Sequence, residues 1–388
     1  MLQPPAITPY RPGRNPPCPA ENRLAGHRDY LDGVRGLAAL WVVLSHLWII
    51  PCGLAARDNW LGWLTNWTLY SHFAVDIFIV LSGFCLVLPV TRDGRLQGGA
   101  VSFFWRRARR ILPPFYAALA FSIGIAILIQ TLTHRPLHIP LPAILANIFL
   151  VQDLLLKLNI FNGPFWSIAV EWRIYFLFPV LVWVLGRYGK RAVLLLALLV
   201  GGMLTLLLLR LHPEMILACP WYLLLFASGL CAGAVSGQRE RRGERLLCLT
   251  CGVFGLAGLI ALVHAHPITA QGGGDFGVYL PFVDPLVGAA AAAVLLLASR
   301  SPRGVPLLSW RPLVSLGTFA YSLYLVHLPC LLLVNTLLTV YAPAFRTPLD
   351  HVYALLLTLP LVVGIARFFY SVFEKPFLRR RQQAQQWT

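Results

Sequence analysis

The sequence predicts an all-α polytopic membrane protein with about ten transmembrane helices and both termini in the cytoplasm. Hydrophobic residues make up 58% of the 388 residues, charged residues make up only 12%, and the mean hydropathy is +0.69. A soluble domain of this length could not bury so much apolar surface. Apolar runs of about 20 residues, enough to cross roughly 30 Å of hydrocarbon, recur along the chain with most basic residues between them.

Ten segments are long and apolar enough to be spans. They are residues 34–51, 72–90, 112–132, 165–186, 192–210, 219–236, 246–264, 280–299, 314–339 and 352–373. We interpret segment 141–156, LPAILANIFLVQDLLL, as re-entrant or interfacial, and the count would become eleven if it crossed the membrane. Residues 30–378 are then one membrane domain between a disordered, proline-rich cytoplasmic arm at 1–29 and a cytoplasmic tail at 379–388.

The positions of Lys and Arg predict the orientation of these spans. With ten spans, 24 of the 32 basic residues lie on the side that holds both termini, and 5 lie on the other side. Because cytoplasmic loops are enriched in Lys and Arg, both termini are predicted to be cytoplasmic, in a cell inner (plasma) membrane. A net charge of +17 would suit a nucleic-acid-binding protein. The basic residues lie between apolar spans, however, which indicates the lipid bilayer as partner and no nucleic acid.

The eight cysteines are scattered, mostly inside apolar runs, where cysteine behaves as a small hydrophobic residue. Cys248 and Cys251 form a CxxC motif without a second pair, so we interpret them as packing residues. We expect no metal site and no permanently bound cofactor.

Ionisable residues inside the spans are costly and are therefore candidate functional groups. A rise of about 1.5 Å per residue places His46 and His327 roughly 20 Å above the cytoplasmic face. Asp76 and Glu171 lie at about 21 to 24 Å on the same scale. Histidines and carboxylates in one buried layer can form an acid/base centre.

Cationic side chains lie at a different level, near the cytoplasmic ends of the spans. Asp32 and Arg35 precede the apolar part of the first span, and the segment 103–116, FFWRRARRILPPFY, places four arginines just before the third. Arginines of this kind grip phosphates bidentately. The layout suits a phosphorylated cofactor with a long reactive arm, and coenzyme A, with an arm on the order of 15 to 20 Å, is one candidate.

Six ordered motifs between residues 30 and 380 resemble the membrane acyltransferase 3 family, which includes bacterial O-acetylases of O-antigen, exopolysaccharide and nodulation factors. They are YLDGVRGLAALWVVLSH, FAVDIFIVLSGFCLV, FFWRRARRILPPFY, GPFWSIAVEWRIYFLFP, SLGTFAYSLYLVHLP and FEKPFLRR. Each motif alone is weak, and the ordered set is specific.

The resemblance implies a ten-helix transferase that moves an acyl group from cytoplasmic acyl-CoA to a hydroxyl, usually of a sugar, at the outer side of the membrane. The matching residues are His46 as catalytic histidine, Arg35 as its signature partner, Asp32 as the acid before it, Arg107 and Arg110 as paired arginines, and Glu171 as the acid of a WSxxVEW-like motif. Arg173 departs from the family, where a less basic residue is frequent, and this puts the choice of acceptor in doubt.

The expected mechanism has His46 as general base on the acceptor hydroxyl, with Glu171 or Asp76 orienting its imidazole. An acyl-histidine intermediate is the rival route. The donor is acyl-CoA, with acetyl as the expected group, and the acceptor is a sugar or glycolipid. Side chains expected near the substrates are Trp166, Tyr175, Tyr324 and His327.

Each of these residues also has a structural interpretation, and the whole chain has a second functional one. Asp76 can cap its helix, the arginines can mark the cytoplasmic side, and a buried histidine can satisfy a backbone carbonyl. A transporter or flippase of a lipid-linked glycan could use the same buried charges, although we find no clear repeat. The sequence leaves open the acyl group, the acceptor and the oligomeric state.

Overall fold

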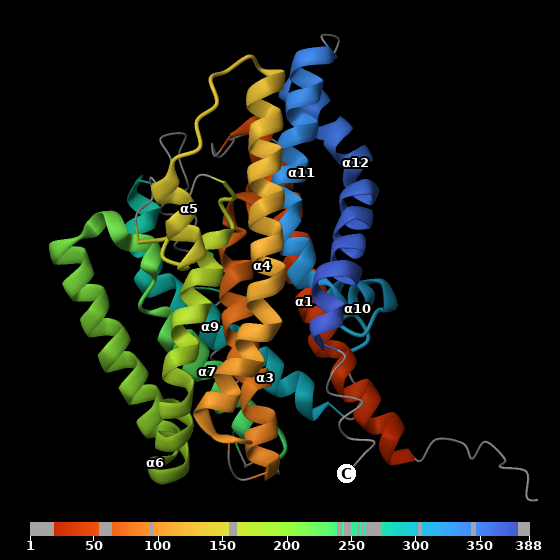
Figure 1. Ribbon diagram of the computed structural model, residues 1–388. Coiled ribbons are helices and arrows are strands. Elements are labelled where there is room, and N and C mark those ends of the chain that lie inside the picture. The colour runs from red at the N-terminus through yellow and green to blue at the C-terminus, as the bar shows by residue number, and fades with distance from the viewer. Residues whose placement is uncertain are drawn as a thin grey trace, which may run out of the picture.

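The computed structural model describes residues 19–53, 64–93, 96–154, 161–238, 274–301, 305–342 and 347–378, with a few residues between 243 and 260. Every regular element in these ranges is helical (Figure 1). The elements are α1 (Pro19–Cys52), η1 (Asn66–Tyr70), α3 (His72–Asp93), α4 (Gly99–Leu132), α5 (Leu141–Ile148), α6 (Phe165–Leu211), η3 (Pro213–Ala218), α7 (Tyr222–Ser236), α9 (Gly274–Arg300), α10 (Arg311–Thr318), α11 (Ala320–Tyr341), α12 (Pro348–Phe369) and η4 (Tyr370–Glu374).

The all-α multi-pass membrane class is confirmed. Within the described residues, seven helices are long and apolar enough to cross a membrane. The apolar helix α7 has only 15 residues, and most of the predicted span at 246–264 lies outside the described residues. The total of about ten spans and the cytoplasmic position of the termini therefore stay predictions.

The 47-residue helix α6 contains two of the predicted spans. Gly189, with φ 79° and ψ 179°, interrupts its helical dihedrals, a conformation that glycine adopts without the steric cost of a Cβ. Figure 1 shows that α6 reverses direction near its label, so that its two arms form a V. The predicted division between 165–186 and 192–210 thus falls at the break.

One predicted boundary differs from the structure, and the short segment 141–156 can be compared with its interpretation. Helix α1 begins at Pro19, so residues 19–29 are helical rather than part of the expected arm, and residues 1–18 lie outside the described residues. In segment 141–156, α5 has eight residues and turns follow it as far as residue 154. Eight residues rise only about 12 Å, so α5 cannot cross the bilayer, as the re-entrant or interfacial interpretation expects.

Glycines allow helices to approach closely at two places that position the cavity described below. A Cβ at Gly229 of α7 would lie 1.9 Å from the carbonyl oxygen of Val80 in α3, and one at Gly83 would lie 2.1 Å from that of Phe226. In the same way, a Cβ at Gly317 of α10 would lie 1.8 Å from the carbonyl oxygen of Asp32 in α1. Small residues of this kind let membrane helices pack backbone to backbone.

Gly229→Ala is expected to destabilise the fold by about 3 kcal/mol or more, because the new methyl group would collide with backbone that cannot move cheaply. Gly202→Ala in α6 is the matched control, since a Cβ there meets nothing within 4 Å. The measurement is equilibrium unfolding in mixed detergent micelles. Equal stability of the two variants would contradict this account of α3 and α7 packing.

Candidate active site

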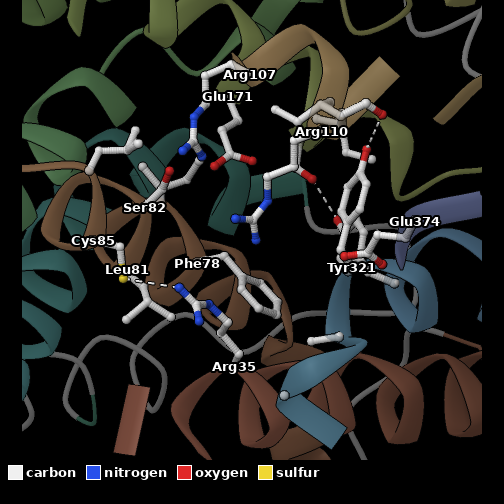
Figure 2. A pocket seen from close by; sticks show the side chains of 18 of the residues that line it. Arg35, Phe78, Leu81, Ser82, Cys85, Arg107, Arg110, Glu171, Tyr321 and Glu374 are labelled. Carbon is white, nitrogen blue, oxygen red and sulfur yellow. Dashed lines mark hydrogen bonds between the residues drawn. The ribbon is translucent and has the colours of Figure 1, made fainter. Parts of the chain in front are cut away.

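A cavity of about 520 Å³ lies between α1, α3, α4, α6, α11 and η4. Charged side chains from four of these elements line it, and Figure 2 shows most of them pointing into the same space. They are Asp32, Arg35, Arg107, Arg110, Glu171 and Glu374. All four residues that the sequence assigns to the donor site, Asp32, Arg35, Arg107 and Arg110, are therefore brought together.

Arg35 is held in place from its own helix and from α3. Its guanidinium forms an ion pair with Asp32, one helical turn earlier, and its Nη2 donates to the Sγ of Cys85, 3.1 Å away. Figure 2 shows Arg35 and Arg110 pointing toward one another from different walls of the cavity. The DGVRG motif thus supplies both a cation and the carboxylate that orients it.

Arg107 and Arg110 provide positive charge without a carboxylate partner. Among the described residues, neither forms an ion pair, and the buried Nε of Arg107 has no hydrogen-bond partner. The adjacent Arg106 lies outside the cavity lining and donates to the carbonyl oxygen of Gln97 at 2.9 Å. Arg107 and Arg110 thus line the cavity, whereas Arg106 forms its hydrogen bonds outside it. The two cavity arginines are suited to bind an anion.

Glu171 lies in this cavity and not beside His46. Its Oε1 accepts a hydrogen bond of 2.5 Å from the hydroxyl of Tyr175, which is also 2.9 Å from Oγ of Ser82. The hydrogen-bond partners of His46 in the described structure are a backbone carbonyl and another histidine. The expectation that Glu171 orients the imidazole of His46 is therefore not met.

Glu374 and Tyr321 are cavity residues that the sequence reasoning did not select. Glu374 lies in η4, a π-helical turn of a type frequent at functional sites, and its buried carboxylate accepts from Ser322. The hydroxyl of Tyr321 donates to the carbonyl oxygen of Ile111 at 3.1 Å. The motif FEKPFLRR was the available signal for Glu374, because it contains a glutamate within an otherwise aromatic and basic stretch.

The two histidines predicted at a common height form a pair. His46 of α1 lies with Nδ1 3.3 Å from Nε2 of His327 in α11, and their ring centres are 5.1 Å apart. His327 is fully buried, whereas His46 is partly exposed. Two side chains for which the sequence predicts a common height thus lie next to each other, and their contact is known only from the structure.

Backbone carbonyls fix the tautomers of the neutral histidines. Nδ1 of His46 is 2.9 Å from the carbonyl oxygen of Val42, and Nδ1 of His327 is 2.9 Å from that of Tyr324. A carbonyl oxygen can only accept, so each Nδ1 must carry the hydrogen. Nε2 of His327 then has a lone pair directed at Nδ1–H of His46, and Nε2 of His46 has a lone pair available to accept a proton.

Tyr324 connects the cavity to the histidine pair. It lines the cavity, and its ring centre is 5.9 Å from that of His327. Its hydroxyl donates to the carbonyl oxygen of Pro164 at 3.0 Å and lies 2.7 Å from Oγ of Ser167. These contacts tie the start of α6, which carries Glu171, to the helix that carries His327.

Asp76 and Trp166 belong to a different cluster. Asp76 is fully buried beside His72 and Asp284, and Trp166 stacks on the ring of His72 with centres 5.5 Å apart. Neither residue contacts the His46 imidazole by a hydrogen bond among the described residues. Asp76 is thus not the orienting carboxylate, and the predicted single layer separates into three sites.

Arg173, the departure from the family pattern, forms an ion pair with the buried Asp153.

A family model described as an acyltransferase domain matches residues 28–367, which is most of the chain. The chain belongs to this acyltransferase family. It is the family that the six sequence motifs resemble, and the matched region includes α1 with the DGVRG motif and α11 with His327.

Curated relatives of this acyltransferase chain include named O-acetyltransferases. Peptidoglycan O-acetyltransferase OatA of Listeria monocytogenes is 24% identical over 81% of this chain and 51% of its own length. O-acetyltransferase OatA of Staphylococcus aureus is 23% identical over 90% of this chain and 57% of its own length, and nodulation protein 10 of Rhizobium leguminosarum is 24% identical over 47% and 52%. The chain thus spans about half the length of these relatives. No solved structure matches it.

Both imidazoles are expected to be Nδ1–H tautomers when neutral, because their Nδ1 atoms face carbonyl oxygens. Nitrogen-15 solid-state NMR on protein with labelled histidine, reconstituted in lipid, measures this directly. His46→Gln and His327→Gln assign the two resonances. An Nε2–H tautomer at His46 would contradict the hydrogen-bond arrangement and leave that nitrogen unable to accept a proton.

Proposed function

We propose that this protein is an acyl-CoA-dependent O-acyltransferase of a glycan or glycolipid. The observation that carries the proposal is the location of an arginine-lined cavity next to a pair of neutral histidines, with Tyr324 shared between them. The cavity offers charge for an anionic donor, and the pair offers a base. Membership of the acyltransferase family supports the same reaction class.

The donor is acyl-CoA, with its phosphates at Arg107, Arg110 and Arg35. Arg107 and Arg110 have no carboxylate partner among the described residues, so a bound phosphate would supply the missing counter-charge. Arg35 and His46 lie on one uninterrupted helix, and three turns separate them by roughly 16 Å. That separation matches a pantetheine arm, which is on the order of 15 to 20 Å long.

The acceptor hydroxyl is activated at Nε2 of His46. This nitrogen takes the proton as the hydroxyl oxygen attacks the thioester carbonyl. The bond from the carbonyl carbon to sulfur then breaks, and the His46 imidazolium returns the proton to the departing CoA thiolate. The charge on the resulting imidazolium is shared with Nδ1–H, which faces the carbonyl oxygen of Val42 and the lone pair of His327. These two neutral acceptors take the place of the carboxylate in a Ser-His-Asp arrangement.

The names of the relatives support a proposal for the acceptor. Two of the most similar proteins carry names that specify O-acetyl transfer, one of them to peptidoglycan. We therefore propose an acetyl group as the cargo and a cell-envelope glycan as the acceptor, with the protein in the plasma membrane. Direct transfer is favoured over an acyl-histidine because one base at His46 is sufficient for it.

Arg107→Ala is expected to weaken acyl-CoA binding by about 10- to 100-fold, since a charge-assisted hydrogen bond to phosphate contributes about 1.5 to 3 kcal/mol. Arg106→Ala is the matched control, because Arg106 contacts Gln97 and Ser102 outside the cavity. Calorimetric titration of the detergent-solubilised protein with acetyl-CoA measures both affinities. Equal affinity in the two variants would rule out the phosphate role of Arg107.

His46→Ala is expected to lower acetyl transfer by at least about 10³-fold, because general-base catalysis typically contributes 10²- to 10⁴-fold. His327→Gln is expected to lower the rate less, since it removes only the acceptor for Nδ1–H. Purified protein, acetyl-CoA and a soluble glycan fragment suffice for the assay. If the protein consumes acetyl-CoA and acetylates the acceptor, transport is excluded as its sole activity. If an acyl-enzyme can be trapped when no acceptor is present, the covalent acyl-histidine route replaces direct transfer.

A further inference from the structure

A second cluster of chemically active side chains lies outside the cavity and the histidine pair. His72 and Asp76 come from the first turns of α3, and Asp284 comes from α9. One imidazole nitrogen and one oxygen of each carboxylate lie within 4.8 Å of one another. The proposed acyl transfer uses none of these three residues.

Both carboxylates are completely buried and only partly satisfied. Asp76 and Asp284 have no exposed area, and within the described structure both oxygens of Asp76 and Oδ1 of Asp284 have no hydrogen-bond partner. Buried carboxylates in a membrane bundle are costly unless a cation or a proton compensates them. Two of them side by side therefore require a ligand that brings positive charge.

We propose that His72, Asp76 and Asp284 bind one divalent transition-metal cation of the Zn²⁺ or Mn²⁺ type. Nε2 of His72 lies 3.0 Å from Oδ2 of Asp284 and 3.9 Å from Oδ1 of Asp76. Ligand atoms about 2.0 to 2.2 Å from a common ion are separated by distances of this size. Two carboxylates neutralise a divalent ion, and an imidazole ligand favours a transition metal over Mg²⁺ or Ca²⁺.

The surroundings of the cluster resemble the outer shell of a metal site. Nε1–H of Trp221 donates to Oδ2 of Asp284 at 2.7 Å. Trp166 stacks flat on the His72 ring, with 7° between the planes. Hydrogen bonds and packing of this kind orient ligands and are part of the affinity of metal sites.

The size of the site distinguishes a small cation from a larger ligand. A sugar cannot reach carboxylates that have no exposed area, whereas an ion fits among three ligand atoms. The remaining rivals are a proton shared by Asp76 and Asp284 and a proton on His72, which lies beside both carboxylates. Either proton alone would neutralise only one of the two charges.

The bound ion would connect α3 directly to α9, and α7 through Trp221. It would also fix the His72 ring on which Trp166 stacks, near the start of the helix that carries Glu171. The ion is thus expected to hold the scaffold beside the acyl-transfer site. It has no place in the transfer reaction itself, so either proposal can fail without the other.

The sequence did not indicate this site because its ligands have no motif spacing. His72 and Asp76 are one helical turn apart, but Asp284 lies 212 residues beyond His72. Asp76 alone was readable as a helix cap or a catalytic carboxylate. Only the packing of α9 against α3 brings in the second carboxylate.

The test is metal analysis of the full-length protein in detergent after equilibration with micromolar Zn²⁺ or Mn²⁺ and removal of free ion. We expect about one ion per chain in the wild type, measured by inductively coupled plasma mass spectrometry. Asp76→Asn and Asp284→Asn are each expected to lower the affinity at least about 100-fold, more than is usual for outer-shell changes. Glu374→Gln is the matched control, since it removes a buried carboxylate elsewhere and is expected to retain the ion.

A chelator is the second measurement, and it does not depend on the variants folding. EDTA is expected to lower the thermal midpoint of the wild type, and Zn²⁺ or Mn²⁺ is expected to restore it. Wild-type protein that contains no ion and shows no response to either treatment would overturn the proposal in favour of a proton at the cluster. Equal metal content in wild type, Asp76→Asn and Asp284→Asn would overturn it as well.

Discussion

The structure depends on one constraint, which is that a charged or polar group inside a membrane bundle must find its partner within the bundle. Asp32 pairs with Arg35, Glu171 accepts from Tyr175, and Arg173 pairs with Asp153. The groups that this rule leaves without partners are the informative ones. Among the described residues they include the Nε of Arg107, whose side chain lines the cavity, and, in the His72 cluster, both oxygens of Asp76 and Oδ1 of Asp284. Both point to ligands of opposite charge, an anion in one case and a cation in the other.

Close helix packing places these groups at the correct positions. The glycines of the DGVRG motif and of α10 let the backbone of α1 approach α10, which sets the position of Asp32 and Arg35. The contact of Gly83 and Gly229 does the same for α3 and α7, and α3 contributes Ser82 and Cys85 to the cavity wall. In a bilayer, helices gain little from hydrophobic association, so close packing of small residues takes on this role. Gly36, Gly83 and Gly317 lie in motifs that resemble the family, and each of them lies at a close backbone contact in this structure.

The histidine pair illustrates how an acid/base centre can be built without a carboxylate. Carbonyl oxygens of α1 and α11 hold the Nδ1–H groups of both rings, which leaves the lone pairs on Nε2. A neutral pair costs less to bury than a histidine–carboxylate ion pair, because no permanent charge is removed from water. Charge then appears only when His46 accepts a proton. The carbonyl oxygen of Val42 and the lone pair of His327 are already directed at the ring that becomes charged.

The sequence by itself predicted the membrane class, the separation of the two spans inside α6 and a common height for His46 and His327, and the resemblance to the family selected the four cavity residues of the donor site. The first three follow from local rules, namely hydropathy and a helical rise that is the same in every span. The partners of Glu171 and Asp76, the inclusion of Glu374 and the cluster with Asp284 were decided only by the tertiary structure. A helical rise specifies the height of a side chain but not the direction in which its helix faces. Direction is set by which helices pack together, and that depends on contacts between segments up to 281 residues apart.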